Sequence, residues 1–249
     1  MTLIGKVAVV TGGASGIGRS ICLRLARDGA EIAVFDLDHA GAQATAQDVA
    51  QLGRRTVAIE VDVSSAANVT EALAAVRRQV GPVQILVNDA GICEYTPFLQ
   101  MSEALWDRMI AVHVKGAFYC ARGVIPDMQT AGWGRIVNLS SVAGLSGGGP
   151  GLVHYATAKA AIIGFTKSLA CEVGPSGITV NAIAPGLIDT PLVRAAKVPE
   201  EILQRLTNET PMRRIGLPDD IAAACAYLMS PDASFLTGQV ISPNGGAYI

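Results

Sequence analysis

The sequence predicts a single α/β domain in which a parallel sheet is covered by helices on both faces, the doubly wound arrangement. Short apolar runs rich in β-forming residues alternate with segments of helical period. These runs are apolar on both faces, which is typical of strands buried between two layers of helices. The alternation is uninterrupted over 249 residues, a length that supports one large core. We therefore predict one domain over residues 1–249, with a seven-stranded parallel sheet.

The expected strands and helices follow one another in a regular order. The strands are expected at residues 7–11, 31–36, 56–62, 84–88, 135–140, 178–184 and 239–242. The helices are expected near residues 17–28, 39–52, 65–80, 102–129, 154–173 and 219–229, with a short one near 200–208. Helix 154–173 is apolar all round, so we expect it to be buried on both sides. One side would pack against the sheet, and the other against a second subunit or, alternatively, a loop. The long irregular stretch 187–216 predicts a lid over a binding site.

Charge and composition exclude several classes of function. The net charge is −2 and Lys and Arg form no dense cluster, so we expect no nucleic-acid partner. No run approaches the ~20 apolar residues of a membrane helix, and the N-terminal residues lack a secretory leader, so we expect a cytoplasmic protein. The five cysteines include no C-x-x-C pair and are expected to be reduced, and no metal site is predicted. The high apolar content, 50%, favours an oligomer.

A glycine-rich turn, Gly12-x-x-x-Gly16-x-Gly18, follows the first expected strand and precedes a helix. Glycines permit close approach of the backbone to a ligand, and a helix N-terminus offers N–H groups to a phosphate. This predicts a dinucleotide site, with a merely tight turn as the alternative. Asp36 ends the second strand, where a carboxylate accepts hydrogen bonds from ribose hydroxyls and repels a 2′-phosphate. No Lys or Arg lies among the glycines or just after Asp36, so NAD is predicted over NADP; a plain strand-end residue is the alternative for Asp36.

Tyr155 and Lys159 are four residues apart in helix 154–173, so one helical turn places the phenol beside the ammonium. A neighbouring cation stabilises a phenolate and lowers the tyrosine pKa from its usual value near 10. This spacing alone is common on solvated helices. Combined with a dinucleotide site in the same domain, it predicts nicotinamide-dependent redox chemistry in which Tyr155 exchanges a proton.

With both the glycine-rich turn and the Tyr155–Lys159 pair, the chain resembles the short-chain dehydrogenase/reductase family from Lys6 to its last ten residues. The motifs that carry the resemblance occur in the family's order. They are Thr11-Gly-Gly-Ala-Ser-Gly-Ile-Gly18, Asp62-Val63, Asn88-Asp-Ala-Gly91, Gly134-Arg-Ile-Val-Asn-Leu-Ser-Ser141, Tyr155 with Lys159, and Pro185-Gly-Leu-Ile-Asp-Thr190. The resemblance implies a Rossmann fold and a homotetramer.

The resemblance also implies roles for individual residues. Tyr155 is the general acid/base, Lys159 lowers the tyrosine pKa and binds the nicotinamide ribose, and Ser141 positions the carbonyl. Ser140 is the alternative to Ser141, because adjacent strand residues face opposite ways. The cofactor residues implied are Gly12, Ser15, Gly16, Ile17, Gly18, Asp36, Asp62, Val63, Asn88, Ala90, Gly91, Tyr155, Lys159, Pro185, Gly186, Ile188 and Thr190.

Three positions depart from the family pattern. His113 stands where the family usually has an asparagine that holds a water in the proton relay, and it either takes over that role as a catalytic residue or is a packed histidine. Asp89 stands where a second asparagine is usual, and a carboxylate cannot donate hydrogen bonds as an amide does. Pro243-Asn244-Gly-Gly246 lacks a usual Asp in a segment that we expect to be structural.

The expected substrate pocket, formed by residues 93–98, 141–153 and 187–194 with Ile92, is mainly apolar. Its apolar members are Ile92, Tyr95, Leu145, Leu152, Leu187 and Leu192; Glu94, Arg194 and Lys197 are the nearest charges. We therefore predict an NAD-dependent alcohol dehydrogenase or carbonyl reductase acting on a small, mainly uncharged secondary alcohol or ketone. An inward Arg194 would instead allow an anionic substrate. The alternatives are an NADPH-linked ketoacyl or sugar reductase and a catalytically silent nucleotide-binding regulator.

Overall fold

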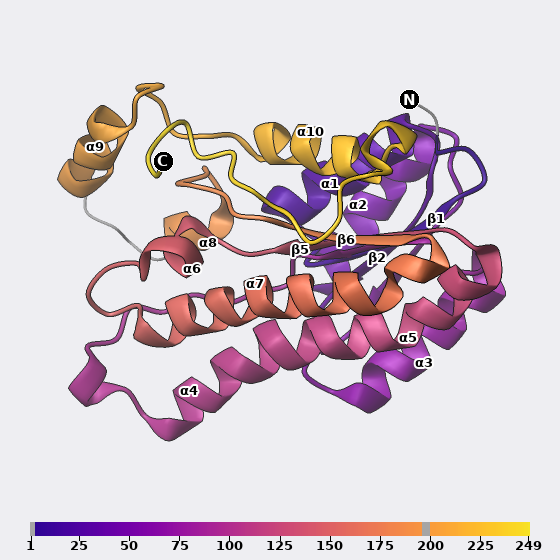
Figure 1. Cartoon of the computed structure of the whole chain (residues 1–249), viewed down its shortest axis with the longest axis horizontal. Coiled ribbons are helices and arrows are strands. Elements are labelled where there is room, and N and C mark those ends of the chain that lie inside the picture. The colour runs from indigo at the N-terminus through magenta and orange to yellow at the C-terminus, as the bar shows by residue number, and fades with distance from the viewer. Residues whose placement is uncertain (1–2, 196–199) are drawn as a thin grey trace.

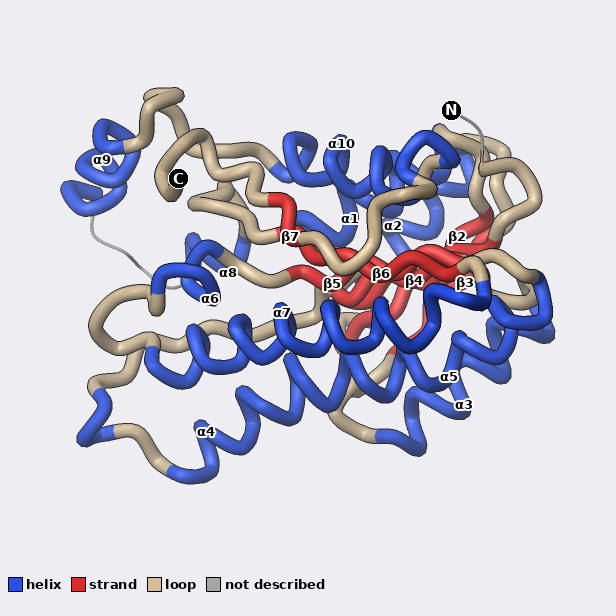
Figure 2. Tube along the Cα trace, viewed as in Figure 1, coloured by secondary structure: helices blue, strands red, loops and turns tan. Residues whose placement is uncertain are grey.

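The computed structural model describes residues 3–195 and 200–249. Within these residues, seven parallel strands form one sheet in the order β3-β2-β1-β4-β5-β6-β7 (Figure 2). The strands are β1 (Val7–Thr11), β2 (Glu31–Asp36), β3 (Thr56–Glu60), β4 (Ile85–Asn88), β5 (Gly134–Leu139), β6 (Ile178–Ile183) and β7 (Val240–Ile241). The predicted doubly wound fold with its seven-stranded parallel sheet is confirmed, and β1 and β2 begin and end at the predicted residues.

Helices cover both faces of the sheet (Figure 1). One face carries α1 (Gly16–Arg27), α2 (His39–Gln51) and α10 (Pro218–Met229), and the other carries α3 (Ala66–Gln79), α5 (Gly116–Ala131) and α7 (Val153–Val173). Each face has its own apolar core. Val10 of β1 belongs to the first core and its neighbour Val9 to the second, because successive strand residues point to opposite faces. Burial on both sides explains why the strands are apolar throughout.

The expected helix over residues 102–129 is present without a break from Glu103 to Ala131, but its geometry changes along its length. It begins as α4 (Glu103–Ile110), where the Ser102 hydroxyl accepts the Leu105 N–H, and continues as α5. Between them lies a π-helical turn, Ala111–Lys115, which contains His113. A π turn accommodates one additional residue in the helical repeat and is frequent at functional sites. The predicted helix is therefore confirmed, whereas the π-helical turn in which His113 is buried was not predicted.

Loops at the carboxyl end of the sheet contain two short helices that the sequence did not predict. They are α6 (Val142–Ser146), directly after β5, and α8 (Pro191–Ala195), after β6. The helix expected near 200–208 is present as α9 (Glu200–Glu209). The ends of segment 187–216 are joined by backbone hydrogen bonds, from Asp189 N to Gly216 O (2.9 Å) and from Gly216 N to Leu187 O (3.0 Å). Lys197 lies outside the described residues.

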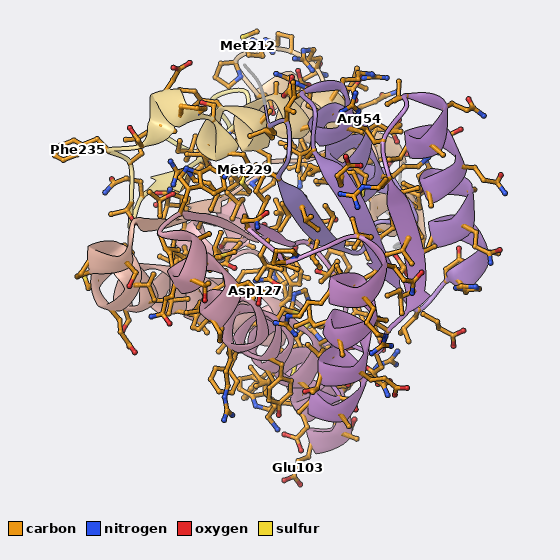
Figure 3. All side chains as sticks on the ribbon, turned by 90° about the vertical axis from the view of Figure 1, so that its right-hand side faces the viewer. Arg54, Glu103, Asp127, Met212, Met229 and Phe235 are labelled. Atoms are coloured by element: carbon orange, nitrogen blue, oxygen red, sulfur yellow. The ribbon has the colours of Figure 1, made fainter. Side chains whose placement is uncertain are left out.

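The described residues also contain three short 3₁₀ turns, at Phe98–Gln100, Gly174–Ser176 and Pro231–Ala233. Asp127 ties α5 to α3 and to the segment before β4, because it accepts the Arg77 Nε–H (2.9 Å) and the Val83 N–H (3.0 Å) (Figure 3). All five cysteines are free, and Cys22, Cys120 and Cys225 are buried. Among the described residues, none of the helices has the length and apolar character that crossing a membrane requires.

Candidate active site

One cavity of about 580 Å³ opens at the carboxyl ends of the strands. It is lined both by the glycine-rich turn and by Tyr155 and Lys159, so it brings the two predicted parts of the site together. In parallel sheets of this kind, ligands bind at the edge where the strand order reverses, here beside β1 and β4. The predicted site residues that line the cavity are Gly12, Ser15, Gly16, Ile17, Asp36, Asp62, Val63, Ala90, Gly91, His113, Ser141, Tyr155, Lys159, Pro185, Gly186, Ile188 and Thr190.

The glycine-rich turn packs too closely for side chains. A Cβ on Gly12 would lie 2.9 Å from Ala90 N, and one on Gly18 would lie 2.2 Å from Gly12 O. The turn is therefore pressed against the end of β4, and its backbone forms the cavity wall at the N-terminus of α1. This cradle fits a dinucleotide diphosphate, because it offers backbone N–H groups with no side chain in between. Gly18 itself does not line the cavity but packs against Gly12 behind the turn, and its assignment as a cofactor residue stays a prediction.

Asn88, also assigned to the cofactor, lies behind the cavity wall. Its Nδ2 donates to Asn138 Oδ1 (2.8 Å), and Asn138 Nδ2 donates to Thr166 Oγ1 (2.9 Å). These buried side chains join β4, β5 and α7. The Asn88 amide thus helps to hold β4, β5 and α7 together, and it does not line the large cavity.

Two carboxylates lie at the adenosine end expected from the sequence. Asp36 Oδ2 accepts the Ala14 N–H (3.0 Å) and its Oδ1 accepts the Asp38 N–H (3.0 Å), which fixes the carboxylate at the end of β2. Asp62 Oδ1 accepts from the Ser64 hydroxyl (2.6 Å). A carboxylate has about four acceptor positions, so Asp36 retains capacity for ribose hydroxyls.

The nearby cations differ in their partners. Arg19 of α1 pairs with Asp48 at 2.6 Å. Arg108 of α4, in contrast, lines the cavity. Nothing in the sequence separates Arg108 from the other charged residues on the exposed face of this helix, and we did not predict it.

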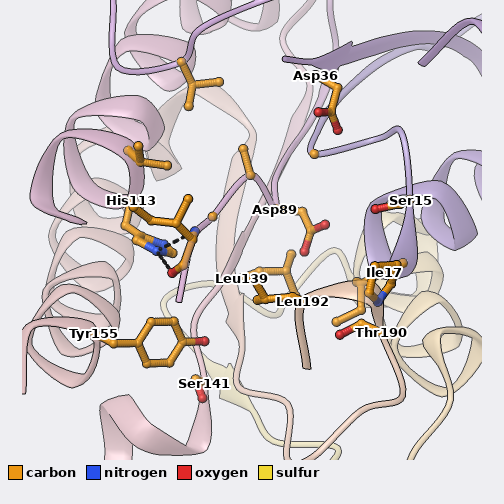
Figure 4. Close-up of a pocket in the computed structure, with 18 of the residues that line it drawn as sticks. Ser15, Ile17, Asp36, Asp89, His113, Leu139, Ser141, Tyr155, Thr190 and Leu192 are labelled. Atoms are coloured by element: carbon orange, nitrogen blue, oxygen red, sulfur yellow. Dashed lines mark hydrogen bonds between the residues drawn. The ribbon is translucent and has the colours of Figure 1, made fainter. Parts of the chain in front are cut away.

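Tyr155 and Ser141 face one another at the opposite end of the cavity (Figure 4). Ser141 precedes α6, and its Oγ accepts the Ala143 N–H (3.1 Å). The Ser140 hydroxyl also borders the cavity but donates to Lys159 O (2.8 Å) and is buried. The geometry therefore favours Ser141 over Ser140 as the serine that meets a substrate oxygen beside Tyr155.

Lys159 is buried, and its Nζ donates to Leu139 O (2.7 Å) while lying 5.6 Å from the centre of the Tyr155 ring. Burial raises the pKa of the Tyr155 phenol, with a smaller contribution from Cys93, and its hydrogen bond with Ser141 only partly opposes this shift. Burial also lowers the pKa of Lys159, which Asp89 partly opposes. Desolvation of the phenol therefore dominates the pKa of Tyr155 in this arrangement, and the expectation that Lys159 lowers that pKa stays a prediction.

His113 packs beneath Tyr155, with the two rings edge to face at 5.7 Å between centroids. Its Nε2 lies 2.8 Å from Ile92 O and 3.2 Å from Ile92 N, so the tautomer decides which hydrogen bond it makes. A Cβ on Gly91 would lie 2.5 Å from the His113 Cε1 atom. Burial, followed by the charge of Lys159, lowers the pKa of His113 to about 3. The imidazole is thus neutral near pH 7 and holds the turn after β4 in place.

Asp89 lines the cavity beside the glycine-rich turn and accepts the Gly18 backbone N–H. Burial raises the pKa of Asp89, although Lys159 and the Gly18 N–H oppose that shift. The sequence marked Asp89 as a departure from the family pattern without placing it in the cavity. The other lining residues that we did not predict are Phe35, Leu37, Val61, Ser64, Arg108, Val112, Leu139 and Ala195. Pro191 and Val193, which also line the cavity, belong to the expected wall 187–194, and Ser140 was the alternative to Ser141.

The expected substrate walls are only partly assembled around this cavity. Ile92 and Leu192 line it, whereas Leu187 lines an adjacent cavity of about 240 Å³; Leu145 and Leu152 line neither, and Tyr95 is 54% exposed. The loop after β4 is joined to the glycine-rich loop before α7 by a hydrogen bond from Thr96 N to Gly151 O (3.0 Å). Arg194 is exposed and pairs with Asp189 at 2.9 Å. Arg194 is therefore not the inward cation that the alternative of an anionic substrate called for.

Comparisons with known proteins agree with this fold and geometry. A family model described as enoyl-(acyl carrier protein) reductase matches residues 12–248. Nodulation protein G of Azospirillum brasilense is 43% identical over 244 residues, and the alignment covers 97% of each chain. The 3-oxoacyl-[acyl-carrier-protein] reductase FabG of Aquifex aeolicus (strain VF5) is 39% identical over 247 residues, covering 99% of this chain and 98% of that protein.

A solved structure is also similar over almost its whole length. The crystal structure of a protein from Sinorhizobium meliloti 1021, described as a short-chain alcohol dehydrogenase, superposes with a TM-score of 0.94 at 37% identity. It covers 99% of this chain and 97% of that chain. The sequence motifs, the sheet order and these comparisons agree, and the chain is an oxidoreductase of the short-chain dehydrogenase/reductase family.

Proposed function

We propose that the protein transfers a hydride between NAD(H) and a small, mainly uncharged secondary alcohol or ketone. Members of its family bind a nicotinamide cofactor and act on small molecules. The observation that carries the proposal is the continuity of one cavity, which runs from the glycine-rich turn and Asp36 to Ser141, Tyr155 and Lys159. A dinucleotide lying along it would place its adenosine at one end and its nicotinamide at the other.

The residues that would hold the dinucleotide follow from this arrangement. The backbone between Gly12 and Ile17 would bind the diphosphate, and Asp36 and Asp62 would bind the adenosine. Lys159 and Thr190, which line the same cavity, would bind the nicotinamide half. A bound nicotinamide supplies or accepts the hydride, which is the cofactor's own chemistry.

The protein's contribution is to orient the carbonyl and to move one proton. In reduction, the Ser141 hydroxyl donates a hydrogen bond to the carbonyl oxygen, and Tyr155 transfers its phenolic proton to that oxygen as the hydride reaches the carbon. Burial raises the pKa of Tyr155, so the phenol is protonated and ready to act as an acid. In oxidation the same group must first lose its proton. Oxidation is therefore expected to accelerate as pH rises.

Two features support NAD over NADP. The Asp36 carboxylate is fixed at the end of β2, where it would accept hydrogen bonds from ribose hydroxyls and repel a 2′-phosphate. Arg19, the first cation of α1, is paired with Asp48. An uncharged substrate is supported by Ile92 and Leu192 in the cavity wall and by the outward pairing of Arg194 with Asp189.

A second candidate is the NADPH-linked reduction of a 3-oxoacyl group. The relative from Aquifex aeolicus carries that activity in its name, and the family model is described by an acyl-carrier-protein reductase. Arg108 also lines the cavity and is the kind of cation that would pair with a 2′-phosphate. A sugar reductase has no comparable support, and the convergence of Ser141, Tyr155 and Lys159 argues against a silent regulator.

The purified protein tests both candidates directly. It is assayed with NAD and NADP against a panel of secondary alcohols, and with NADH and NADPH against ketones and a 3-oxoacyl thioester, by following the absorbance of the reduced nicotinamide. We expect turnover of uncharged alcohols or ketones with NAD(H). Turnover restricted to NADPH and the thioester would establish the second candidate instead, and cofactor binding without any turnover would indicate the regulator.

Association into a homotetramer belongs to the same proposal. Phe235 is fully exposed after α10 (Figure 3). Phe118 of α5 is 43% exposed. The face of α7 that carries Ala160 and Gly164 is also exposed in the single chain. Exposed apolar side chains of this kind are typical of subunit contacts. Sedimentation velocity would give the mass in solution, with a monomer contradicting the proposal.

A further inference from the structure

Asp89 is a carboxylate at a place where the cavity is built to receive another anion. It follows β4 directly and accepts the backbone N–H of Gly18 in the first turn of α1. Its Oδ2 lies 2.8 Å from the position that a Gly18 Cβ would occupy, so the carboxyl group sits against the glycine-rich turn. In Figure 4 it lies between that turn, at Ser15, and Leu139 at the end of β5.

The charged and titratable groups around Asp89 come from every element packed against it. Lys159 and Tyr155 belong to α7, Asp36 to β2, Cys22 to α1 and Cys225 to α10. Lys159 is the only cation among them, and its Nζ is already hydrogen-bonded to Leu139 O. Asp36 adds a second negative charge to the same cavity. Burial outweighs Lys159 and raises the pKa of the Asp89 carboxyl.

A dinucleotide diphosphate would bring further negative charge to the turn. The energy of a carboxylate next to that charge rises steeply in a poorly solvated cavity. A protonated carboxyl group does not meet this repulsion, and it has an O–H donor where the family's usual asparagine has an amide N–H. The two forms of Asp89 therefore differ in their compatibility with a bound diphosphate.

We propose that Asp89 couples dinucleotide binding to the uptake of one proton, so that the dinucleotide binds to the form of the protein in which Asp89 carries a neutral carboxyl group. The inference rests on the proposed function, because it requires a dinucleotide at the glycine-rich turn. The proton comes from solvent and converts the carboxylate to the acid, with no other bond formed or broken.

The sign of the pH dependence follows from linkage. The diphosphate raises the Asp89 pKa above its value in the free protein, so the complex binds more protons between the two values. Affinity is then greatest below the pKa of the free protein and falls by up to about tenfold per pH unit above it. It becomes constant again above the pKa of the complex.

Isothermal titration calorimetry measures this coupling without turnover. ADP-ribose and NAD are each titrated into the protein in buffers of different ionisation enthalpy, from mildly acidic to mildly alkaline pH, which gives the number of protons taken up per ligand. We expect uptake with both ligands in the wild type. Uptake with ADP-ribose assigns the effect to the diphosphate half, whereas uptake with NAD alone would overturn the proposal.

Asp89→Asn provides the decisive comparison, because the amide is isosteric with the acid and does not titrate. We expect D89N to bind ADP-ribose with a smaller proton uptake and a flatter pH dependence than the wild type. Asp107→Asn, which neutralises an exposed carboxylate of α4 that does not line the cavity, is the matched control and should keep the wild-type proton uptake. Thermal unfolding of each variant verifies that it is folded.

The outcomes separate this inference from the proposed function. If D89N takes up as many protons as the wild type, Lys159 or another group is responsible and the role of Asp89 is overturned. If the wild type binds NAD without proton uptake, the coupling alone is overturned and the proposed function stands. If the wild type binds neither NAD nor NADP, the proposed function fails.

Discussion

The ring of His113 lies edge to face against the ring of Tyr155, with 5.7 Å between their centroids and 85° between their planes. The same histidine contacts the backbone of Ile92 through its Nε2 atom. It therefore links the π-helical turn to the loop after β4 directly beneath the phenol. Because its neutral imidazole already contacts Ile92, we expect His113 to act as a positioning residue for Tyr155.

His113 gives a prediction for stability against pH. Its pKa is lowered to about 3, so below pH 6.5 the unfolded chain binds a proton that the folded chain does not. Stability is then fully present above pH 6.5 and is lost as pH falls toward 3; at about pH 4.5 the loss is ~3 kcal/mol. Urea unfolding of wild type and His113→Asn near these two pH values should show a smaller acid loss in the variant. Equal losses would contradict a buried neutral histidine.

The activity of His113→Asn tests its positioning role separately. An amide offers Ile92 both a donor and an acceptor, so we expect kcat within about tenfold of the wild type and an unchanged shape of the pH–rate profile. His113→Ala, which leaves Ile92 and the ring face of Tyr155 without this contact, should lose more activity than the asparagine variant. A changed acid limb in His113→Asn would assign the histidine a direct part in proton transfer.

Removal of the Ser141 hydroxyl and removal of the Ser140 hydroxyl are predicted to have different effects on activity and stability. Ser141→Ala should lower kcat/KM by ~10²-fold through loss of a hydrogen bond to the substrate oxygen, with little change in stability. Ser140→Ala removes the buried bond to Lys159 O and should cost about 1 kcal/mol of unfolding free energy, with the smaller loss of activity. Steady-state kinetics and urea unfolding distinguish them. The reverse pattern would move the role to Ser140.

Asp36→Ala is predicted to weaken NAD more than NADP. Loss of a charged acceptor for the ribose hydroxyls should raise the NAD dissociation constant by about tenfold, whereas NADP gains from the loss of repulsion. Asp36→Asn retains an acceptor without the charge and separates these two effects. Calorimetric binding of both cofactors provides the measurement. An unchanged preference would show that another residue reads the ribose, with Arg108→Gln as the next variant.

Gly18→Ala is predicted to disrupt the turn although Gly18 does not line the cavity. The added Cβ would lie 2.2 Å from Gly12 O, so the backbone has to move, at a cost of roughly 1–3 kcal/mol and with loss of dinucleotide binding. Gly174→Ala, at the end of α7, is the matched control, because its backbone is helical (φ −52°) and its Cβ would enter open space. That variant should be neutral or more stable by up to about 1 kcal/mol. Dinucleotide binding by Gly18→Ala at wild-type affinity would contradict this account.

The fold was predictable because buried parallel strands leave a clear pattern. β1 and β2 are apolar on both faces and are bounded by charged or glycine residues, so their bounds match the prediction. The π-helical turn around His113 was not predictable in this way, because one additional residue in a long helix hardly disturbs its apolar period. α6 and α8 are five residues each and are too short to show a period.

The candidate site was predictable where a motif fixes backbone geometry, and less so where tertiary packing decides. Gly18 and Asn88 belong to the expected motifs, yet both act from behind the cavity wall. Arg108 lines the cavity, but it belongs to a helix, α4, whose charged residues read in the sequence as an ordinary solvent-exposed face. The high pKa of Tyr155 depends on how far α7 buries the phenol, which the spacing to Lys159 cannot reveal.

Turnover and NAD affinity of Tyr155→Phe, measured on the same preparation, test the central claim most directly. Removing only the phenolic oxygen should leave the NAD dissociation constant within a few-fold of the wild type while lowering kcat by about 10²–10⁴-fold, the usual contribution of a general acid/base. A Tyr155→Phe variant that turns over alcohol or ketone at close to the wild-type rate would contradict the assignment of proton transfer to Tyr155.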